Sequence, residues 1–312
     1  MKYFDLHADI GHDVYEKDKL GIHHVIKDIH LPKFTKGHVT GINMVSFFEG
    51  SETWADVTKR IELLEADLAT CSQFKIIDTS NDLNTLGDKI AVIFSIEGMC
   101  AIDENFKSQI DYLYDHHIRI ASLTWNDTNR LATGCEGEVN RGLSELGIKV
   151  VHYLEEKNIL IDVSHANETT FWDIMKHSKK TILATHSNAS SLCLHPRNIS
   201  DEQIKAIANR DGIIGLNGCE FFVSSNPACG DIEHFVEHAK YMKDLVGIEH
   251  IALGLDFMDI FSTCDPCMCV GLSDTTQLPN LDAICIQAGF SEDERNKLYS
   301  ENVINLLLNN LK

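Results

Sequence analysis

The sequence has no run of about 18 apolar residues, the length that a membrane-spanning helix requires. Basic residues are also scarce, since 27 Lys and Arg stand against 47 Asp and Glu and leave a formal net charge of −20. This charge repels a polyphosphate backbone and anionic membrane surfaces, and no basic stripe interrupts it. We therefore expect a soluble protein that has neither nucleic acid nor a membrane as a partner.

The motifs of several common enzyme classes are missing too. No G-x-G-x-x-G follows the first apolar segment, which disfavours a dinucleotide-binding site, and no G-x-x-x-x-G-K-[ST] predicts a phosphate-binding loop. No G-x-S-x-G marks a nucleophilic serine. Ser164 directly precedes His165, but neighbouring strand residues point to opposite faces, so these two are not expected to form a nucleophile and base.

The N-terminal stretch MKYFDLHADIGHD lacks the long apolar segment of a secretory signal, and we expect the chain to stay in the cytoplasm. In that reducing compartment the ten cysteines are expected to be thiols, most of them acting as small hydrophobic residues. Cys264, Cys267 and Cys269 lie close together in an irregular stretch, about residues 258–281. They form either a metal site or, as the plainer alternative, a flexible loop over the mouth of an active site.

Eight short apolar runs recur along the chain, each followed by enough residues for one helix. They are residues 2–7, 40–48, 89–97, 119–125, 159–165, 181–186, 212–217 and 250–257. Strands that are apolar on both faces are typical of a parallel sheet covered by helices. Eight such units in 312 residues predict an α/β fold, a (β/α)8 TIM-type barrel, as one domain over residues 1–312. The alternative is an open, doubly wound sheet.

Residues of the types that bind metals lie at the carboxyl ends of the predicted strands, where barrel enzymes carry their active sites. They are His7, Asp9, Glu97, His165, His186 and Asp256. His7 and Asp9 are two residues apart, so both side chains fall on one face of an extended segment. Taken singly, each histidine is better explained as a hydrogen-bonded core residue, and Glu97 as an acid at a helix N-terminus. If the barrel is closed, however, all six converge on one point.

Neutral imidazoles and carboxylates together suit Zn²⁺ or a similar divalent ion, whereas a structural zinc site would use cysteine. Three acids and three histidines are more than one tetrahedral ion needs. Two ions that share a carboxylate fit this set better. The sequence therefore predicts a hydrolytic centre with two metal ions.

An ordered series of segments resembles the membrane dipeptidase family of zinc peptidases, also called renal dipeptidases, among the amidohydrolase-like barrels. The series runs through DLHAD, FSIEG, LTWNDTN, GLSELGIKVVHYLEEKNILIDVSH, ATHSNASSLCLHPRNISDEQI, GLDF and SENVINLL, and so covers nearly the whole chain. The resemblance implies a metallo-dipeptidase with two Zn²⁺ ions. Such an enzyme cleaves small dipeptides, some with a C-terminal D-residue, by a hydroxide that bridges the metals. It also implies a homodimer.

Carried over motif by motif, the resemblance assigns His7 and Asp9 to the first zinc ion and His165 with His186 to the second. Glu97 would bridge the two ions and so take part in catalysis. These are the residues that the strand-end argument selects.

The resemblance also implies roles outside the metal ligands. Arg197 would receive the terminal carboxylate of the substrate, for which a planar guanidinium is suited, and Asp256 would transfer the proton during catalysis. Without the resemblance, Arg197 would be taken for a surface arginine in a loop. Trp125 stands where some family members carry a histidine that binds the substrate and polarises the scissile carbonyl, so here either Asn126 or a metal takes over that role, or the substrate differs. Trp125 and Asn126 are the expected substrate contacts.

Because of Trp125, a second hypothesis keeps the barrel and the metals but changes the substrate to another amide, a lactone or a phosphoester. This enzyme would be a metal-dependent amidohydrolase or lactonase. A third hypothesis is a barrel without catalytic activity that serves binding or assembly. The presence of all six metal-ligand candidates argues against the third, because inward-facing charges are costly to bury without a function.

Overall fold

The computed structural model describes residues 1–226, 230–261 and 267–312. Within them the strands form one parallel sheet. The strands are β1 Tyr3–Ala8, β2 Val39–Phe47, β3 Phe74–Ile76, β4 Ile90–Glu97, β5 Ile118–Ser122, β6 Leu160–Asp162, β7 Ile182–Leu183, β8 Ile214–Leu216 and β9 Ile251–Leu253. Nearly every residue of these strands is buried, as expected for a sheet that is covered on both faces.

The sheet closes into a barrel. Its strand order is β7-β6-β5-β4-β2-β1-β9-β8, and the two ends of this series meet where Ala184, directly after β7, pairs with Ile214 of β8. The amide of Gly215 donates to the Ala184 carbonyl at 2.8 Å, and the Ala184 amide donates to the Ile213 carbonyl at 3.0 Å. The predicted (β/α)8 barrel is thus confirmed. The short strand β3 pairs only with β4 on the outside and was not predicted.

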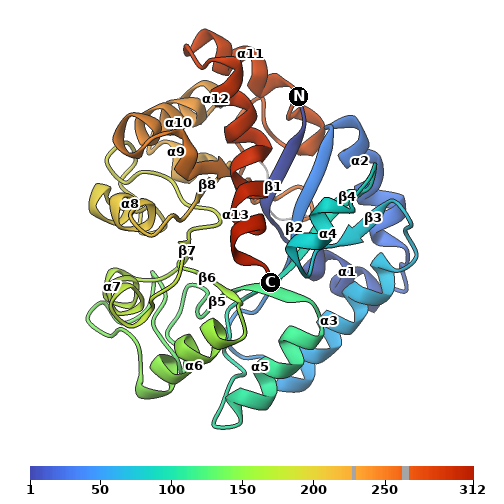
Figure 1. The fold of residues 1–312 in the computed structure, drawn as a ribbon, viewed down its shortest axis with the longest axis vertical. Helices are drawn as coiled ribbons and strands as arrows, with labels where there is room; N and C mark the ends of the chain where they lie inside the picture. The colour runs from blue at the N-terminus through green and yellow to red at the C-terminus, as the bar shows by residue number, and fades with distance from the viewer. Residues whose placement is uncertain (227–229, 262–266) are drawn as a thin grey trace.

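The helices surround the barrel as a ring (Figure 1). The α-helices are α1 Ile10–Lys19, α2 Leu31–Lys36, α3 Trp54–Leu68, α4 Ser80–Asn84, α5 Phe106–Asp115, α6 Glu145–Glu156, α7 Glu168–His177, α8 Asp201–Ala208, α9 Glu220–Val223, α10 Ile232–Val246, α11 Asn280–Gln287, α12 Glu292–Asn296 and α13 Asn302–Asn310. Helix α6 packs its apolar face inward through Val150, Val151 and Leu154, as its spacing of apolar residues predicts.

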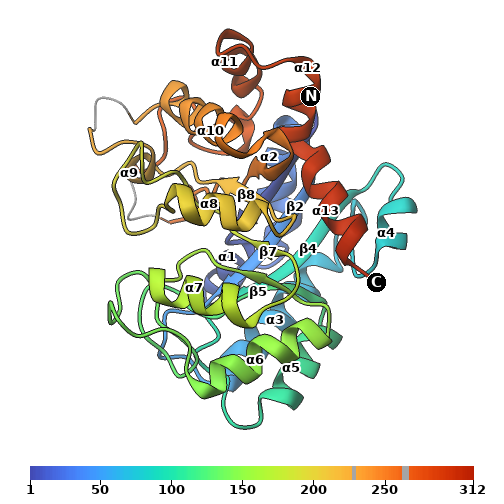
Figure 2. The same cartoon turned by 60° about the vertical axis from the view of Figure 1, so that its left-hand side comes forward.

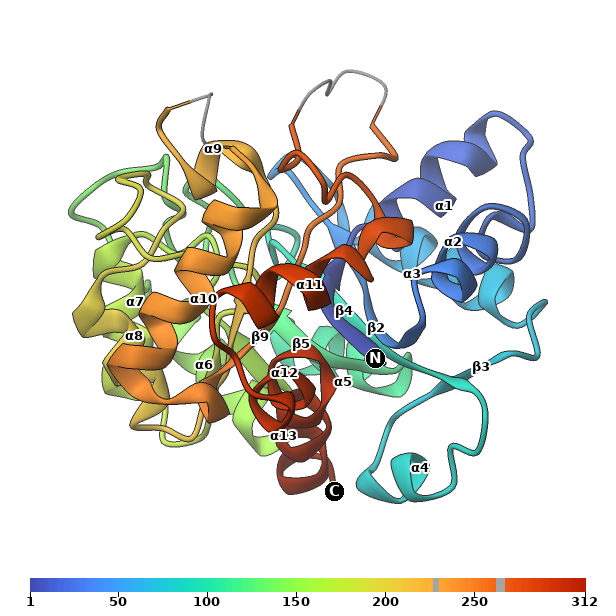
Figure 3. The same ribbon diagram turned by 90° about the horizontal axis from the view of Figure 1, so that it is seen from above.

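One end of the barrel is plugged by α13, which crosses the middle of the ring in Figure 1. Val303, Leu306 and Leu307 of this helix pack against Phe4 of β1 and Leu160 of β6 in a cluster that fills this end of the barrel. Figures 2 and 3 show α13 at the opposite end of the molecule from α9. The barrel is therefore open to a ligand only at the end where the carboxyl termini of its strands lie.

The cysteines follow the expectation in part. Cys71, Cys193, Cys219, Cys269 and Cys285 are buried thiols. The expectation of thiols throughout is wrong at Cys267, which is disulfide-bonded and in this state offers no thiolate to a metal. Of the three cysteines in the predicted loop, Cys269 is a buried thiol and Cys264 lies outside the described residues.

No helix in the described part of the chain is both long and apolar enough to cross a membrane.

Candidate metal centre

The predicted ligands lie together at the carboxyl end of the barrel, on different strands. His7 is in β1 and Glu97 is the last residue of β4, while His165, His186 and Asp256 follow shortly after β6, β7 and β9. Each is at least half-buried, and the two carboxylates and three imidazoles point into one small space. The convergence that was predicted for a closed barrel is therefore present.

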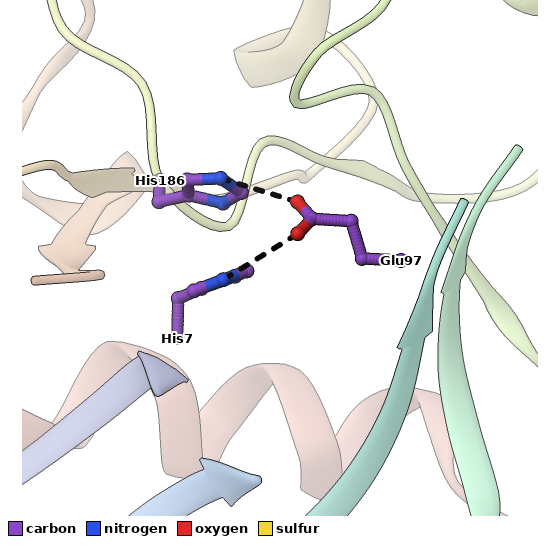
Figure 4. Close-up of side chains that lie close together, drawn as sticks. All are labelled: His7, Glu97 and His186. Carbon is purple, nitrogen blue, oxygen red and sulfur yellow. Dashed lines mark ion pairs between the residues drawn. The ribbon is translucent and has the colours of Figure 1, made fainter. Parts of the chain in front are cut away.

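One group of atoms gathers around Glu97 Oε1. It lies 3.0 Å from His165 Nε2 and 3.3 Å from His186 Nε2, and the two imidazole nitrogens are 3.0 Å apart. Ligands of a tetrahedral zinc ion, with bonds of about 2.0–2.1 Å, are separated by about 3.3 Å. Figure 4 shows the rings of His186 and His7 turned toward the two oxygens of the single Glu97 carboxylate.

A second group surrounds His7 Nε2. This nitrogen lies 3.4 Å from Asp9 Oδ1, 3.8 Å from Asp256 Oδ1 and 3.9 Å from Glu97 Oε2. The separations again resemble those between ligands of one ion. Asp9 comes near His7 for a different reason than predicted, because it is not in an extended strand but at the N-cap of α1, with φ −74° and ψ 41°. Glu97 thus faces both groups, with one oxygen toward each.

Two buried oxygens test whether these residues fit a cation. Asp9 Oδ1 and Glu97 Oε1 are inaccessible to solvent and accept no hydrogen bond of suitable geometry. A buried carboxylate oxygen without a donor is costly, and a bound cation removes that cost. The donor set contains only imidazole nitrogens and carboxylate oxygens, which suits zinc or a similar divalent ion. The residues present therefore fit a divalent metal centre.

The carboxylates around His7 favour a positive charge between them. Burial alone would lower the pKa of His7, but the carboxylates of Glu97, Asp9 and Asp256 raise it to about 10. Burial raises the pKa of Asp9 to about 7. Burial acts in the same direction on Glu97, but the imidazoles of His165 and His7 hold its pKa well below the usual range. Because a metal must compete with protons for such ligands, its affinity falls as the pH is lowered.

The pKa values of His165 and His186 are shifted in the opposite direction to that of His7. Burial, assisted by the Arg197 guanidinium, lowers the pKa of His165. The pKa of His186 lies well below its usual value because of burial and the nearby charges of His7 and Arg197. Both imidazoles are therefore neutral near pH 7, which is the form that binds metal ions.

The backbone is unusual at two of these residues. His165 has φ 68° and Asp256 has φ 54°, both in the left-handed region that residues other than glycine seldom adopt. Such conformations tend to occur at functional sites, where the surrounding structure holds them in place. Here the His165 carbonyl accepts a 2.7 Å hydrogen bond from the Cys135 amide, and the Asp256 amide donates to the His7 carbonyl at 3.1 Å.

Residues that were not predicted as part of the site orient the ligands. The hydroxyl of Thr185 lies 2.8 Å from His186 Nδ1, and Asn217 Nδ2 donates to Asp256 Oδ2 at 3.0 Å. Asn126, predicted as a substrate contact, has its Oδ1 2.7 Å from His165 Nδ1. The oxygen of Asn126 is thus engaged with a histidine.

Arg197 is buried beside this centre rather than lying on the surface. Its side chain donates to the His186 carbonyl at 3.2 Å and borders the same cavity of about 400 Å³ as Asp9, Glu97 and Asp256. In the described part of the chain four other arginines form ion pairs with carboxylates, and Arg197 forms none. A buried guanidinium without a carboxylate is suited to receive an anionic group of a ligand.

Trp125 forms part of an aromatic wall of the same cavity. Its ring stacks against Phe47 with centroids 5.8 Å apart, and Phe261 lies 6.2 Å from Phe47. All three side chains line the cavity. Trp125 is therefore placed to contact a ligand, although it offers an apolar surface instead of the polar imidazole that some family members carry there.

Comparisons with known proteins agree with this geometry. The family model described as "Membrane dipeptidase (Peptidase family M19)" matches residues 1–309. A protein of Klebsiella pneumoniae, described as an uncharacterized protein in the pqqA 5' region, is 30% identical over 80% of this chain and 88% of its own. The dipeptidase tcpJ of Claviceps purpurea is 24% identical over 81% of this chain, and the match covers 59% of that longer protein.

The fold also matches solved structures. A metallo peptidase from Rhodobacter sphaeroides, crystallised with a phosphinate mimic of the dipeptide L-Ala-D-Ala, superposes with a TM-score of 0.87 at 21% sequence identity. The superposition covers 100% of this chain and 99% of the other. At this identity the likeness concerns the fold.

Proposed function

Because the chain belongs to the membrane dipeptidase family and is accordingly a metal-dependent hydrolase of peptide bonds, we propose that it cleaves small dipeptides with two zinc ions. The observation that carries the proposal is the position of Glu97. Its two carboxylate oxygens face two separate groups of ligands, in the cavity that Arg197 also borders.

In this proposal His7 and Asp9 hold one ion, His165 and His186 hold the other, and Glu97 contacts both. Two zinc ions bound there would lower the pKa of a shared water and polarise the scissile carbonyl. Three imidazoles, in the neutral form that binds metals, and two carboxylates supply ligands to both ions without any cysteine. A similar divalent metal would fit the same donor atoms.

The substrate is oriented by Arg197 at its C-terminal carboxylate, which a guanidinium can bind through two parallel hydrogen bonds. Trp125 and Phe47 contact the N-terminal residue through their rings. A second cavity, of about 650 Å³, shares Arg197 and His165 with the first and leaves room next to the C-terminal residue. The L-Ala-D-Ala mimic bound by the Rhodobacter protein supports acceptance of a C-terminal D-residue here.

Asp256 is proposed as the general base and acid. Asn217 occupies its Oδ2, so Oδ1 is the oxygen that faces His7 and the reacting groups. From there the carboxylate can take a proton from the attacking water and return it to the leaving amine. A positioned carboxylate of this kind contributes about 10²–10⁴-fold to the rate.

A second candidate function follows from Trp125. The aromatic wall lacks the imidazole that would polarise a peptide carbonyl, and an apolar surface also suits an N-acyl amino acid or a lactone. This alternative keeps the metal centre and changes only the substrate.

The experiment that tests the proposal compares zinc-loaded wild type with Arg197→Ala on three substrate groups. These are L,L- and L,D-dipeptides, the same dipeptides with an amidated C-terminus, and N-acyl amino acids with lactones. We expect R197A to lower kcat/KM on free dipeptides by about 30-fold or more, because truncating one partner of a buried charge pair costs about 2–5 kcal/mol. Arg197→Lys keeps the charge but not the planar guanidinium, so its kcat/KM should lie between those of the wild type and R197A.

The amidated dipeptides serve as the control for the carboxylate contact. They should be poor substrates for the wild type, and R197A should change their cleavage little, because the group that Arg197 binds is already gone. Equal cleavage of free and amidated dipeptides by the wild type would contradict the role of Arg197. Activity on N-acyl amino acids or lactones with none on any dipeptide would establish the second candidate instead.

A further inference from the structure

A single hydroxyl lies between two of the proposed metal ligands, on the side of their rings away from Glu97. Thr185 Oγ1 is 2.8 Å from His186 Nδ1 and 3.5 Å from His7 Nδ1, and it donates to Asp162 Oδ2 at 2.5 Å. Thr185 is 1% exposed and Asp162 is 4% exposed. His7 lies in β1 and His186 follows β7, so this contact joins two separate parts of the barrel.

The direction of these hydrogen bonds is set by Asp162. Its Oδ1 accepts the backbone amides of Ser164 at 2.9 Å and Thr185 at 3.0 Å, which leaves Oδ2 to accept the Thr185 hydroxyl. A hydroxyl has only one proton to donate. Once this proton points at Asp162, Oγ1 can act only as an acceptor toward the two imidazoles.

An acceptor at Nδ1 requires that each imidazole carries a proton there. The lone pair of the neutral ring is then on Nε2, and Nε2 is the nitrogen of both rings that faces the Glu97 carboxylate. Metal-binding histidines are commonly fixed in this way by a partner on the other ring nitrogen.

We propose that Thr185 and Asp162 form an orienting pair that holds His7 and His186 with Nε2 available to the metals, so that one hydroxyl organises ligands of both ions. Thr185 and Asp162 are positioning residues, since neither lines the cavity that Arg197 and Glu97 border. The inference rests on the proposed function, in which His7 and His186 bind metal.

The first test replaces Thr185 by valine, which keeps the branched shape and removes the hydroxyl, and by serine, which keeps the hydroxyl. Zinc affinity is measured by competition with a chromogenic chelator, and the thermal midpoint of the metal-free protein is recorded alongside. We expect zinc to bind T185V about 10–100-fold more weakly, the usual effect of losing such a partner. The zinc affinity of T185S should stay close to that of the wild type.

T185V leaves Asp162 Oδ2 without a donor and is liable to misfold, so Asp162→Asn provides a second comparison. In D162N the amide oxygen remains on the two backbone amides and the new NH₂ group meets Thr185 Oγ1. The hydroxyl proton must then turn toward an imidazole, which places the ring proton on Nε2 and blocks the metal. Zinc affinity should fall in D162N, whereas Asp103→Asn, the same change at a distant residue that bonds the Asn105 amide, should leave it unchanged.

The outcomes separate the inference from the function on which it rests. Native zinc affinity in folded T185V or D162N would overturn the orienting pair, as would an equal loss of affinity in T185S and T185V. A purely structural role would lower the thermal midpoint of the metal-free variants and leave the zinc affinity of the folded protein intact. Wild-type protein that binds no zinc would overturn the proposed function itself.

Discussion

Glu97→Gln is expected to remove zinc and hydrolysis together. The wild-type carboxylate has one oxygen 3.0 Å from His165 Nε2 and the other 3.9 Å from His7 Nε2, so it serves both groups of ligands. A glutamine has one oxygen and no charge, and its NH₂ group would repel a cation. We expect the zinc content, measured by plasma mass spectrometry, to fall from two ions per chain to one or none. Since bound zinc ions lower the activation barrier by several kcal/mol, kcat/KM on dipeptides should fall at least about 10³-fold when they are lost.

Glu65→Gln is the matched control for this change. Glu65 also pairs with a histidine, His116, at 3.0 Å, but it lies on α3, outside the cavity. E65Q should keep its zinc and its activity. An E97Q protein that still holds two zinc ions with wild-type affinity would contradict the bridging role of Glu97.

Asp256→Asn is expected to separate turnover from metal content. In the proposed mechanism Asp256 carries a proton in each catalytic cycle, so kcat should fall by about 10²–10⁴-fold. In the proposed site His7, Asp9 and Glu97 remain to hold one ion, so we expect two zinc ions per chain to stay bound. Zinc content by mass spectrometry and steady-state kinetics on one dipeptide would be measured on the same preparation.

The geometry also makes Asp256 a candidate ligand, because its Oδ1 groups with His7 Nε2 and Asp9. Parallel losses of zinc and turnover in D256N would therefore reassign it from proton carrier to ligand. Asp259→Asn, the same substitution at a nearby residue that pairs with Lys33, is the control and should change neither quantity.

The strands and the convergence of the six ligand candidates could be predicted from the sequence because they depend on a strong and repeated signal. Eight apolar runs, five of which end in residues of metal-ligand types, have few other arrangements than a closed parallel barrel. The strand β3 gave no such signal, since only one of its three residues, Phe74, is buried. The alternation argument for His7 and Asp9 led to the right neighbours although Asp9 is not in a strand.

Thr185 was missed because alternation would place it on the opposite face from His186. The strand β7 ends at Leu183, so the chain has left the extended pattern before it reaches either residue. Asp162 could have been found, since it is a carboxylate inside a buried apolar run, and the same reasoning had selected Glu97. The left-handed backbone of His165 and Asp256 had no signal in the sequence at all, because it depends on contacts with distant segments.

The most direct test of the account is a zinc titration of metal-free protein, followed by cleavage of L-Ala-L-Ala and L-Ala-D-Ala. We expect no cleavage without metal, a cleavage rate that rises with zinc and reaches its plateau at two zinc ions per chain, and loss of activity on adding a chelator. A plateau at one ion would contradict the binuclear centre. Zinc-saturated protein that leaves both dipeptides intact would contradict the dipeptidase function.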